Sequence, residues 1–187
     1  MTRHNKQKAH NDVNGSPVRR SGGPRPARRL GYSGPSTSEI PTEDQLSDVV
    51  TVGTWNVRTL LQAGKLELLQ RELDRLRYDV VGLAEVRWPG SGQMAQGRFL
   101  YTGEQNGGEK GVAFFLSVRA KRALIEWLPI SSRVIVARFK GRKNNLSVLQ
   151  AYAPTADSSD EDLEEFYDQV EEGLTKMPNR DLCVVTG

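Results

Sequence analysis

Three polar residues stand at the ends of apolar, strand-like segments and are the first candidates for chemistry. Asn56 ends one such segment, Glu85 lies at the end of a second, and Tyr152 ends a third. An amide, a carboxylate and a phenol can together bind a phosphate group and a hard metal ion. Cleavage of a phosphodiester needs such groups, because charge on the transition state must be neutralised and an attacking water must be aimed. The three residues therefore indicate part of a metal-dependent phosphodiesterase site.

Each of the three also has a plain structural interpretation. Glu85 ends a wholly apolar strand, where it could face a site or form an exposed ion pair with Arg87, and the pattern favours neither. Asn56 could close its strand as a turn residue. Tyr152 could pack at a sheet edge, although Pro154 biases the residue before it toward an extended conformation that keeps the strand end open. Two further arginines are expected to be ordinary exposed side chains: Arg58 and Arg133.

The histidine and cysteine content excludes several classes of enzyme. The only histidines are His4 and His10. Residues 49–187 therefore cannot assemble a Ser-His-Asp or Cys-His hydrolase, or a histidine-rich zinc site. The single cysteine, Cys183, excludes an internal disulfide and is expected to be a buried small hydrophobe. Any chemistry must come from carboxylates, amides, tyrosines and a hard metal ion.

Hydrophobic periodicity predicts a mixed α/β domain. A first helix, 65–77, lies between two apolar strands, which indicates a βαβ crossover with parallel strands. A second helix ends near Met177, with Ser158 as its N-cap and Glu161 in the capping-box position. The apolar stripes comprise Leu66, Leu69, Leu73 and Leu76 in the first helix and Leu163, Phe166, Tyr167, Val170 and Leu174 in the second. Strands are expected at 49–56, 78–86, 98–102, 112–117, 124–128, 133–140, 146–152 and 181–187, with loops at 89–97 and 103–111.

Charge divides the chain into a basic leader and a mildly acidic body. Residues 1–38 contain eight Lys or Arg and one acid, a balance of +7, whereas residues 39–187 contain 18 Lys or Arg and 22 acids, a balance of −4. The leader is rich in Gly, Pro, Ser and Arg, so it cannot bury enough surface to offset the cost of ordering. We expect a disordered basic tail at 1–45 and a folded domain at 46–187. The tail would bind nucleic-acid phosphates, act as an import signal, or be a solvated leader without a partner.

The sequence also bears on membranes and location. No apolar run approaches the roughly 18 residues that span a bilayer, and the N-terminus lacks an apolar signal core. We expect an intracellular, nuclear protein without a membrane partner.

Three short motifs, taken together, give a family resemblance. They are Gly53-Thr-Trp-Asn-Val-Arg-Thr-Leu60, Gly82-Leu-Ala-Glu-Val-Arg-Trp88 and Tyr152-Ala-Pro-Thr155. With them, residues 49–187 resemble the apurinic-type endonuclease domain of non-long-terminal-repeat retrotransposons, within the endonuclease/exonuclease/phosphatase superfamily. The resemblance implies an α/β fold, a two-layer β-sandwich flanked by helices, that is truncated here at its C-terminus.

The resemblance also implies roles for the three candidate residues. Glu85 matches the family's metal-binding glutamate, which would hold Mg²⁺, with Mn²⁺ as an alternative. Asn56 matches the asparagine that orders the metal–phosphate network, and Tyr152 matches the active-site tyrosine. In that family an Asp-Phe-Asn would follow Gly187, and a later Asp and His would complete the catalytic machinery. Asp181 lies at the wrong end of its strand to substitute for them.

One principal function and two alternatives follow. The principal one is a retroelement-derived, magnesium-dependent DNA endonuclease, cut before its catalytic core is complete and therefore inactive as the chain stands. The alternatives are a non-catalytic derivative that binds DNA, RNA or chromatin through the basic tail, and a phospholipid or inositol-phosphate phosphoesterase of the same superfamily. A missing half also predicts a poorly folded chain whose apolar sheet face is open to water. That face would include Val112, Phe114, Val134 and Val148.

Overall fold

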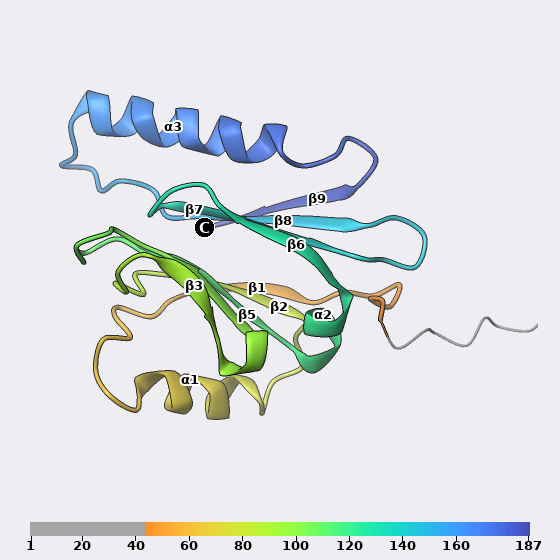
Figure 1. Cartoon of the computed structure of the whole chain (residues 1–187). Helices are drawn as coiled ribbons and strands as arrows, with labels where there is room; N and C mark the ends of the chain where they lie inside the picture. The colour runs from red at the N-terminus through yellow and green to blue at the C-terminus, as the bar shows by residue number, and fades with distance from the viewer. Residues whose placement is uncertain (1–43) are drawn as a thin grey trace, which may run out of the picture. The chain divides into compact units, whose positions relative to one another are not determined.

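Two β-sheets pack face to face, and a helix covers the outer face of each (Figure 1). The computed structural model describes residues 44–187, which all belong to the unit Glu39–Gly187. Of the disordered tail predicted over residues 1–45, residues 1–43 lie outside the described residues. Within 44–187, no helix has both the length and the apolar character needed to cross a membrane.

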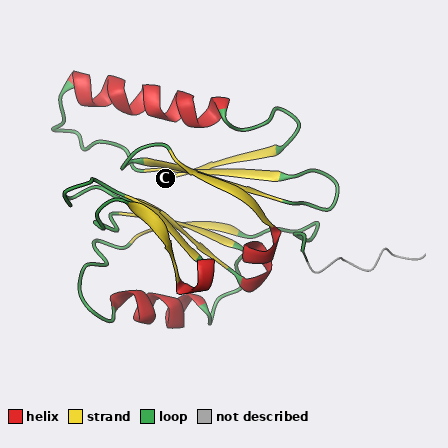
Figure 2. Ribbon diagram, viewed as in Figure 1, coloured by secondary structure: helices red, strands yellow, loops and turns green. Residues whose placement is uncertain are grey.

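The elements follow one another in an order that alternates strands and helices at both ends of this region (Figure 2). They are β1 Val52–Asn56, α1 Lys65–Leu73, β2 Val80–Ala84, β3 Ser91–Met94, the 3₁₀ turn η1 Ala95–Gly97, β4 Phe99–Thr102, β5 Val112–Leu116, α2 Val118–Ala123, β6 Leu124–Pro129, β7 Val134–Phe139, β8 Leu146–Ala151, α3 Asp160–Thr175 and β9 Leu182–Thr186. One sheet has the strand order β1-β2-β5-β4-β3 and the other β6-β7-β8-β9.

The first sheet begins with a parallel pair. β1 and β2 run parallel with α1 as their crossover, which confirms the predicted βαβ unit. β5, β4 and β3 continue the sheet in antiparallel fashion. Leu69 and Leu73 of α1 pack with Leu83 and Phe115 on the outer face. Because the strand β2 is buried on both faces, its sequence is apolar throughout.

The second sheet is a meander that ends in a return crossover. β6, β7 and β8 are antiparallel neighbours, and β9 lies parallel to β8 after the chain passes through α3. Phe166 of α3 packs with Val134 and Leu149 on the outer face. Both sheets thus place a parallel pair at one edge: β1 with β2, and β9 with β8.

The inner faces of the two sheets form one apolar core. Phe114 and Val112 from the first sheet share a cluster with Val148 and Ile135 from the second. The prediction that a sheet face would be open to water is therefore wrong for this chain. Val112, Phe114 and Val148 have no exposed surface because each sheet covers the other, and Val134 has none because it lies beneath α3.

One polar side chain is buried between the sheets. Gln150 has no exposed surface, and its Oε1 accepts hydrogen bonds from Thr54 Oγ1 at 3.3 Å and from Thr186 Oγ1 at 2.7 Å. Its Nε2 donates to the carbonyl of Ala151 at 3.0 Å. Gly82 leaves room for this amide, because a Cβ at position 82 would collide with Gln150 Oε1. The polar group is satisfied, so its burial costs little.

Two stretches differ from the predicted secondary structure. The segment 89–97, expected to be a loop, contains β3 and η1. The residues of β3 are mostly polar and show no apolar alternation, so the strand forms because its backbone pairs with β4. The short helix α2 was not expected. It begins after Ser117, whose Oγ accepts the amide of Ala120 at 3.0 Å.

The two predicted helices also differ in detail. α1 ends at Leu73, with Asp74 as its C-cap, because the amides of Arg75 and Leu76 bond three residues back, in a tighter turn. The N-cap of α3 is Ser159 and not Ser158, since Ser159 Oγ accepts the amide of Asp162 at 3.1 Å. The predicted stripe of α3 is only partly buried: three of its members are exposed, namely Leu163, Tyr167 and Leu174.

Candidate active site at the strand ends

The parallel pairing of β1 and β2 brings two of the predicted site residues together. Asn56 is the last residue of β1 and lies opposite Ala84, the last residue of β2, so Glu85 follows directly beside it. Asn56 Nδ2 donates a hydrogen bond to Glu85 Oε1 at 2.6 Å. Carboxyl ends of adjacent parallel strands meet at one sheet edge, which is why residues 29 positions apart touch.

The third predicted residue reaches this edge from the other sheet. Tyr152 follows the last residue of β8, and its hydroxyl donates to the same Glu85 Oε1 at 3.1 Å. The three candidates therefore lie in one hydrogen-bonded group at the place where the two sheets meet. Their catalytic and metal-binding roles remain predictions.

Glu85 is also paired with Arg87. Arg87 Nη2 lies 3.2 Å from Glu85 Oε2, and the two side chains are 32% and 16% exposed. Glu85 therefore forms the ion pair with Arg87 that the sequence allows and also accepts the hydrogen bonds from Asn56 and Tyr152, while its role as a metal ligand stays a prediction. Arg87 Nε is buried and, within the described part of the chain, has no hydrogen-bond partner. A buried donor without an acceptor is uncommon and is a feature that a bound anion would satisfy.

The contacts set the charge of Glu85 and the protonation of Tyr152. The hydrogen bond from Asn56 holds the pKa of Glu85 below its ordinary value, against the opposing effect of burial, with further lowering by Arg87 and Tyr152. Burial raises the pKa of Tyr152, and its hydrogen bond to Glu85 raises it further. At neutral pH the group thus consists of an ionised carboxylate and a protonated phenol that can act as a donor.

Arg133 holds Tyr152 in place and was missed as a part of this site. It precedes β7 and, through the β7–β8 pairing, lies beside Tyr152. Its Nη1 donates to the carbonyl of Tyr152 at 3.0 Å, and its guanidinium lies 5.3 Å from the centre of the tyrosine ring. The only sequence signal is its register in the hairpin, which pairs position 133 with 152.

Arg58 has the exposed side chain that the sequence predicts. Its backbone amide donates to Asn56 Oδ1 at 3.0 Å, so both ends of the Asn56 amide group are fixed. Arg58 therefore contributes to the site through its backbone.

The two loops that carry these residues are strained. Among the described non-glycine residues, positive φ occurs at six, and four of these lie in the loops after β1 and β2. They are Arg58, Thr59, Glu85 and Arg87, with φ of 50°, 97°, 57° and 62°. Such conformations cost about 1–3 kcal/mol each and persist only where the surroundings enforce them. Backbone hydrogen bonds from Thr59 to Glu85 and from Leu60 to Val86, at 2.7 and 3.1 Å, lock the two loops together.

The donor set suits a hard metal ion bound in an open manner. Within residues 44–187, no three His, Cys, Asp or Glu side chains are placed to share a metal. Mg²⁺ often uses one or two protein carboxylates and completes its shell with substrate phosphates and water. Glu85, ionised and partly accessible, fits this mode, whereas a cage built wholly from protein ligands does not fit.

Comparison with known proteins identifies relatives over most of the described region. No family model matches the chain. Craniofacial development protein 2 from Bos taurus is 33% identical over 138 residues, which are 73% of this chain and 23% of that protein. The Tragulus javanicus protein of the same name is also 33% identical over 138 residues and is covered to 24%. The chain thus spans about a quarter of the length of the curated relatives it matches.

A solved structure agrees with the observed fold. Humanized D. rerio TDP2 carrying 14 mutations superposes with a TM-score of 0.50 at 12% identity, over 73% of this chain and 64% of that one. At this identity the likeness concerns the fold alone. The chain is thus similar to craniofacial development protein 2 over 73% of its length, and its two-sheet sandwich with outer helices is a fold that it shares with humanized D. rerio TDP2.

Proposed function

We propose that residues 44–187 carry the metal- and phosphate-binding part of a magnesium-dependent site that cleaves DNA phosphodiesters. One observation carries this proposal: Asn56 and Tyr152, from different sheets, both donate to the same oxygen of Glu85. A structural ion pair with Arg87 alone would need neither donor. The resemblance of the motifs to retrotransposon endonuclease domains makes DNA the substrate class proposed.

Each residue has a distinct task in this proposal. Glu85 would hold Mg²⁺, or Mn²⁺ in its place, and the ion when bound would neutralise charge on the phosphate oxygens. Asn56 orients Glu85 and keeps it ionised. Tyr152, protonated because burial raises its pKa, would turn its one hydroxyl hydrogen from Glu85 to a phosphate oxygen when the phosphodiester binds. Arg87 provides positive charge beside the carboxylate and an unused buried Nε–H.

The group has no residue suited to remove a proton from water. The two histidines of the chain are at positions 4 and 10, and Glu85 already accepts three hydrogen bonds. We propose that residues 1–187 bind Mg²⁺ and a phosphodiester without turnover, and that a general base must come from outside the described residues.

A second candidate is a non-catalytic nucleic-acid-binding protein. Two observations favour it: a single carboxylate in the group, and a balance of +7 over residues 1–38. Removal of residues 1–38 would then abolish most DNA binding and flatten its salt dependence, because each lost phosphate contact contributes a slope of about −0.9. Glu85→Gln would leave binding unchanged.

Metal binding separates the two candidates. Titration of residues 1–187 with Mn²⁺, followed by paramagnetic broadening of backbone amide signals, should broaden the signals around Glu85. Glu85→Gln should weaken this binding by about tenfold or more, because the isosteric amide has lost the anionic ligand. Glu72→Gln is the matched control, since Glu72 is also paired with an arginine, Arg75, but lies on α1.

Nicking of supercoiled plasmid tests the chemistry. We expect none from residues 1–187 with Mg²⁺, and magnesium-dependent nicking from a chain extended over the length of its relatives. Glu85→Gln should abolish nicking by the extended chain. Equal Mn²⁺ binding by Glu85→Gln and the parent, or nicking by an extended Glu85→Gln chain at the parent rate, would refute the metal assignment.

A further inference from the structure

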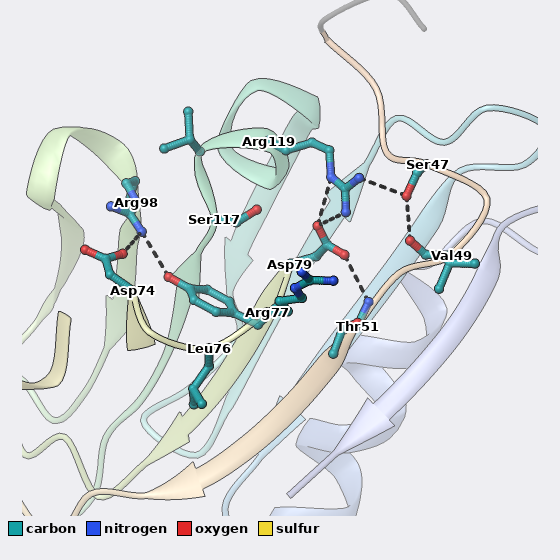
Figure 3. A pocket seen from close by; sticks show the side chains of 12 residues that line it. Ser47, Val49, Thr51, Asp74, Leu76, Arg77, Asp79, Arg98, Ser117 and Arg119 are labelled. Carbon is teal, nitrogen blue, oxygen red and sulfur yellow. Dashed lines mark hydrogen bonds and ion pairs between the residues drawn. The ribbon is translucent and has the colours of Figure 1, made fainter. Parts of the chain in front are cut away.

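A pocket lies at the opposite end of β1 and β2 from Glu85. Its volume is about 780 Å³, and its walls include Thr51 before β1, Asp79 before β2 and Ser117 after β5 (Figure 3). Asp79 and Glu85 are six residues apart along an extended strand, which is about 20 Å. The pocket is therefore separate from the strand-end site, and its volume is within the usual range for a small-molecule site.

One side of the pocket is a fixed arginine on a buried carboxylate. Arg119 donates through Nε and Nη2 to Asp79 Oδ1 at 3.0 and 2.6 Å, and through Nη1 to Ser47 Oγ at 2.9 Å. Asp79 is 2% exposed, and its other oxygen accepts the amide of Thr51 at 3.0 Å. Both carboxylate oxygens of Asp79 thus accept hydrogen bonds from the protein, while the Arg119 side chain remains 47% exposed.

The other side holds a second fixed arginine with a phenol. Arg98 Nε donates to the carbonyl of Leu116, and Nη2 donates to both Asp74 Oδ1 and the Tyr78 hydroxyl, each at 2.9 Å. The Tyr78 oxygen accepts in this contact, so its own hydrogen remains for another acceptor. Figure 3 shows Arg98 with Asp74 on one side of the pocket and Arg119 with Asp79 on the other.

A third arginine lines the pocket without an ion pair. Arg77 is exposed and, among the described residues, forms no salt bridge or side-chain hydrogen bond. Exposed apolar side chains also line the pocket: Leu76 and Val118 are 60% and 54% exposed. The wall therefore offers three guanidinium groups against two carboxylates, together with apolar surface.

We propose that this pocket binds an organic phosphate ester, with its phosphate on the arginines and its organic part on Leu76 and Val118. Guanidinium groups recognise phosphate through several hydrogen bonds at once. Donors reach the pocket from separate elements, the segments before β2 and β4 and the helix α2. This suits a tetrahedral anion better than a planar carboxylate, because its oxygens accept from several directions.

Binding of a nucleotide to the whole chain tests the proposal. Backbone amide signals of residues 1–187 would be followed by NMR during titration with adenosine 5′-monophosphate, with adenosine and with citrate. We expect the monophosphate to shift the signals of Arg77, Tyr78 and Arg119, and the other two to leave them in place. Inorganic phosphate, as a fourth probe, should cause the same shifts with weaker affinity.

Two variants of matched charge locate the binding. Arg77→Ala should weaken binding of the monophosphate about tenfold, as expected for loss of one charge-assisted contact. Arg71→Ala removes an exposed arginine from α1 outside the pocket and should change nothing. Glu85→Gln should also change nothing, so the pocket and the strand-end site succeed or fail separately. Equal losses in Arg77→Ala and Arg71→Ala, equal shifts with adenosine or citrate, or shifts confined to residues 1–43 would overturn the proposal.

Discussion

Glu85 is the residue on which the strand-end site depends. Its Oε1 accepts from Asn56 and Tyr152, and its Oε2 accepts from Arg87. The donors come from the end of β1, from the second sheet and from the loop after β2. The pKa of Glu85 therefore depends on the positions of all three segments. The hydrogen bond from Asn56 is the largest single cause of the lowered pKa of Glu85.

Loss of Asn56 should be visible in the titration of Glu85. Asn56→Ala removes the largest cause of the lowered pKa, so the pKa of Glu85 should rise toward its ordinary value of 4.5. In the parent, the ionised form stabilises the fold above that value and the contribution disappears as the pH falls through the lowered pKa, so this contribution should shrink in the variant. Carboxyl ¹³C NMR measures the pKa directly. Asn106→Ala, in the exposed loop 103–111, is the control. An unchanged Glu85 pKa in Asn56→Ala would contradict the assignment.

The sequence could place the candidate residues but not their partners. Asn56 and Glu85 are predicted to meet because a βαβ crossover fixes both strand ends at one edge. The contact of Tyr152 with Glu85 depends on how two sheets pack, which no local pattern encodes. The same holds for Arg133, which looks like any exposed strand-leading arginine until its register with Tyr152 is known.

At the scale of elements, one buried ion pair ties β9 to its sheet. Asp181 accepts from Arg138 Nε at 2.6 Å and from Ser147 Oγ at 2.9 Å, which links the segment before β9 to β7 and β8. The Asp181 side chain is 1% exposed. The hydrogen bond from Arg138 is the largest cause of its lowered pKa.

This pair should make stability depend on pH. Because the folded-state pKa of Asp181 is below its ordinary value of 3.8, its contribution is present above that value and lost as the pH falls through the lowered pKa. Asp181→Asn should destabilise the fold by about 2 kcal/mol at pH 7. The remaining carboxylate partner of Arg138 is then Glu126, whose Oε1 lies 3.6 Å from Arg138 Nη1. Urea unfolding from pH 7 to pH 2 should show the difference shrinking below about pH 4. The exposed Asp157→Asn should show no such difference. A difference for Asp181→Asn that is constant with pH would count against the pair.

Gly173 sets how α3 lies on the second sheet, and the helix pattern did not reveal this. A Cβ there would lie 2.8 Å from Leu149 Cδ1 and 3.3 Å from Val134 Cγ1. The close approach turns the line of Phe166, Val170 and Gly173 toward the sheet. The expected stripe counted large side chains and gave no weight to a glycine, so Leu163, Tyr167 and Leu174 were wrongly expected to be buried.

Alanine at position 173 should therefore destabilise the fold despite its helix propensity. Replacing a mid-helix glycine gains about 1 kcal/mol, but overpacking a core costs about 1–3 kcal/mol. Leu149 has no exposed surface and little room to move, so we expect a net loss of about 1 kcal/mol. Gly53→Ala is the control, because a Cβ there meets nothing within 4 Å. It should be neutral or stabilising by about 0.5 kcal/mol in urea unfolding. A stabilised Gly173→Ala would show that the helix can move away.

For the described region as a whole, the decisive feature is that the sheets share one core. The cluster that contains Phe114 and Leu100 from the first sheet also contains Ile135 and Val148 from the second. Neither sheet can lose its inner face without exposing the other. Sequence patterns identified these residues as apolar strand residues, but which sheet faces which is a property of the assembled fold.

The shared core predicts that both sheets unfold in a single transition. Phe114→Ala, in the first sheet, should destabilise residues 44–187 by about 3–5 kcal/mol, and Ile135→Ala, in the second, by about 2–5 kcal/mol, because both side chains are fully buried. Each substitution should shift the whole transition to lower temperature, whether it is followed by tryptophan fluorescence or by far-ultraviolet circular dichroism. The half-exposed Ile125→Ala is the control and should change the midpoint little. Two separate transitions, with each substitution moving only one of them, would show that the sheets fold independently and that the contact between Tyr152 and Glu85 is not maintained by a common core.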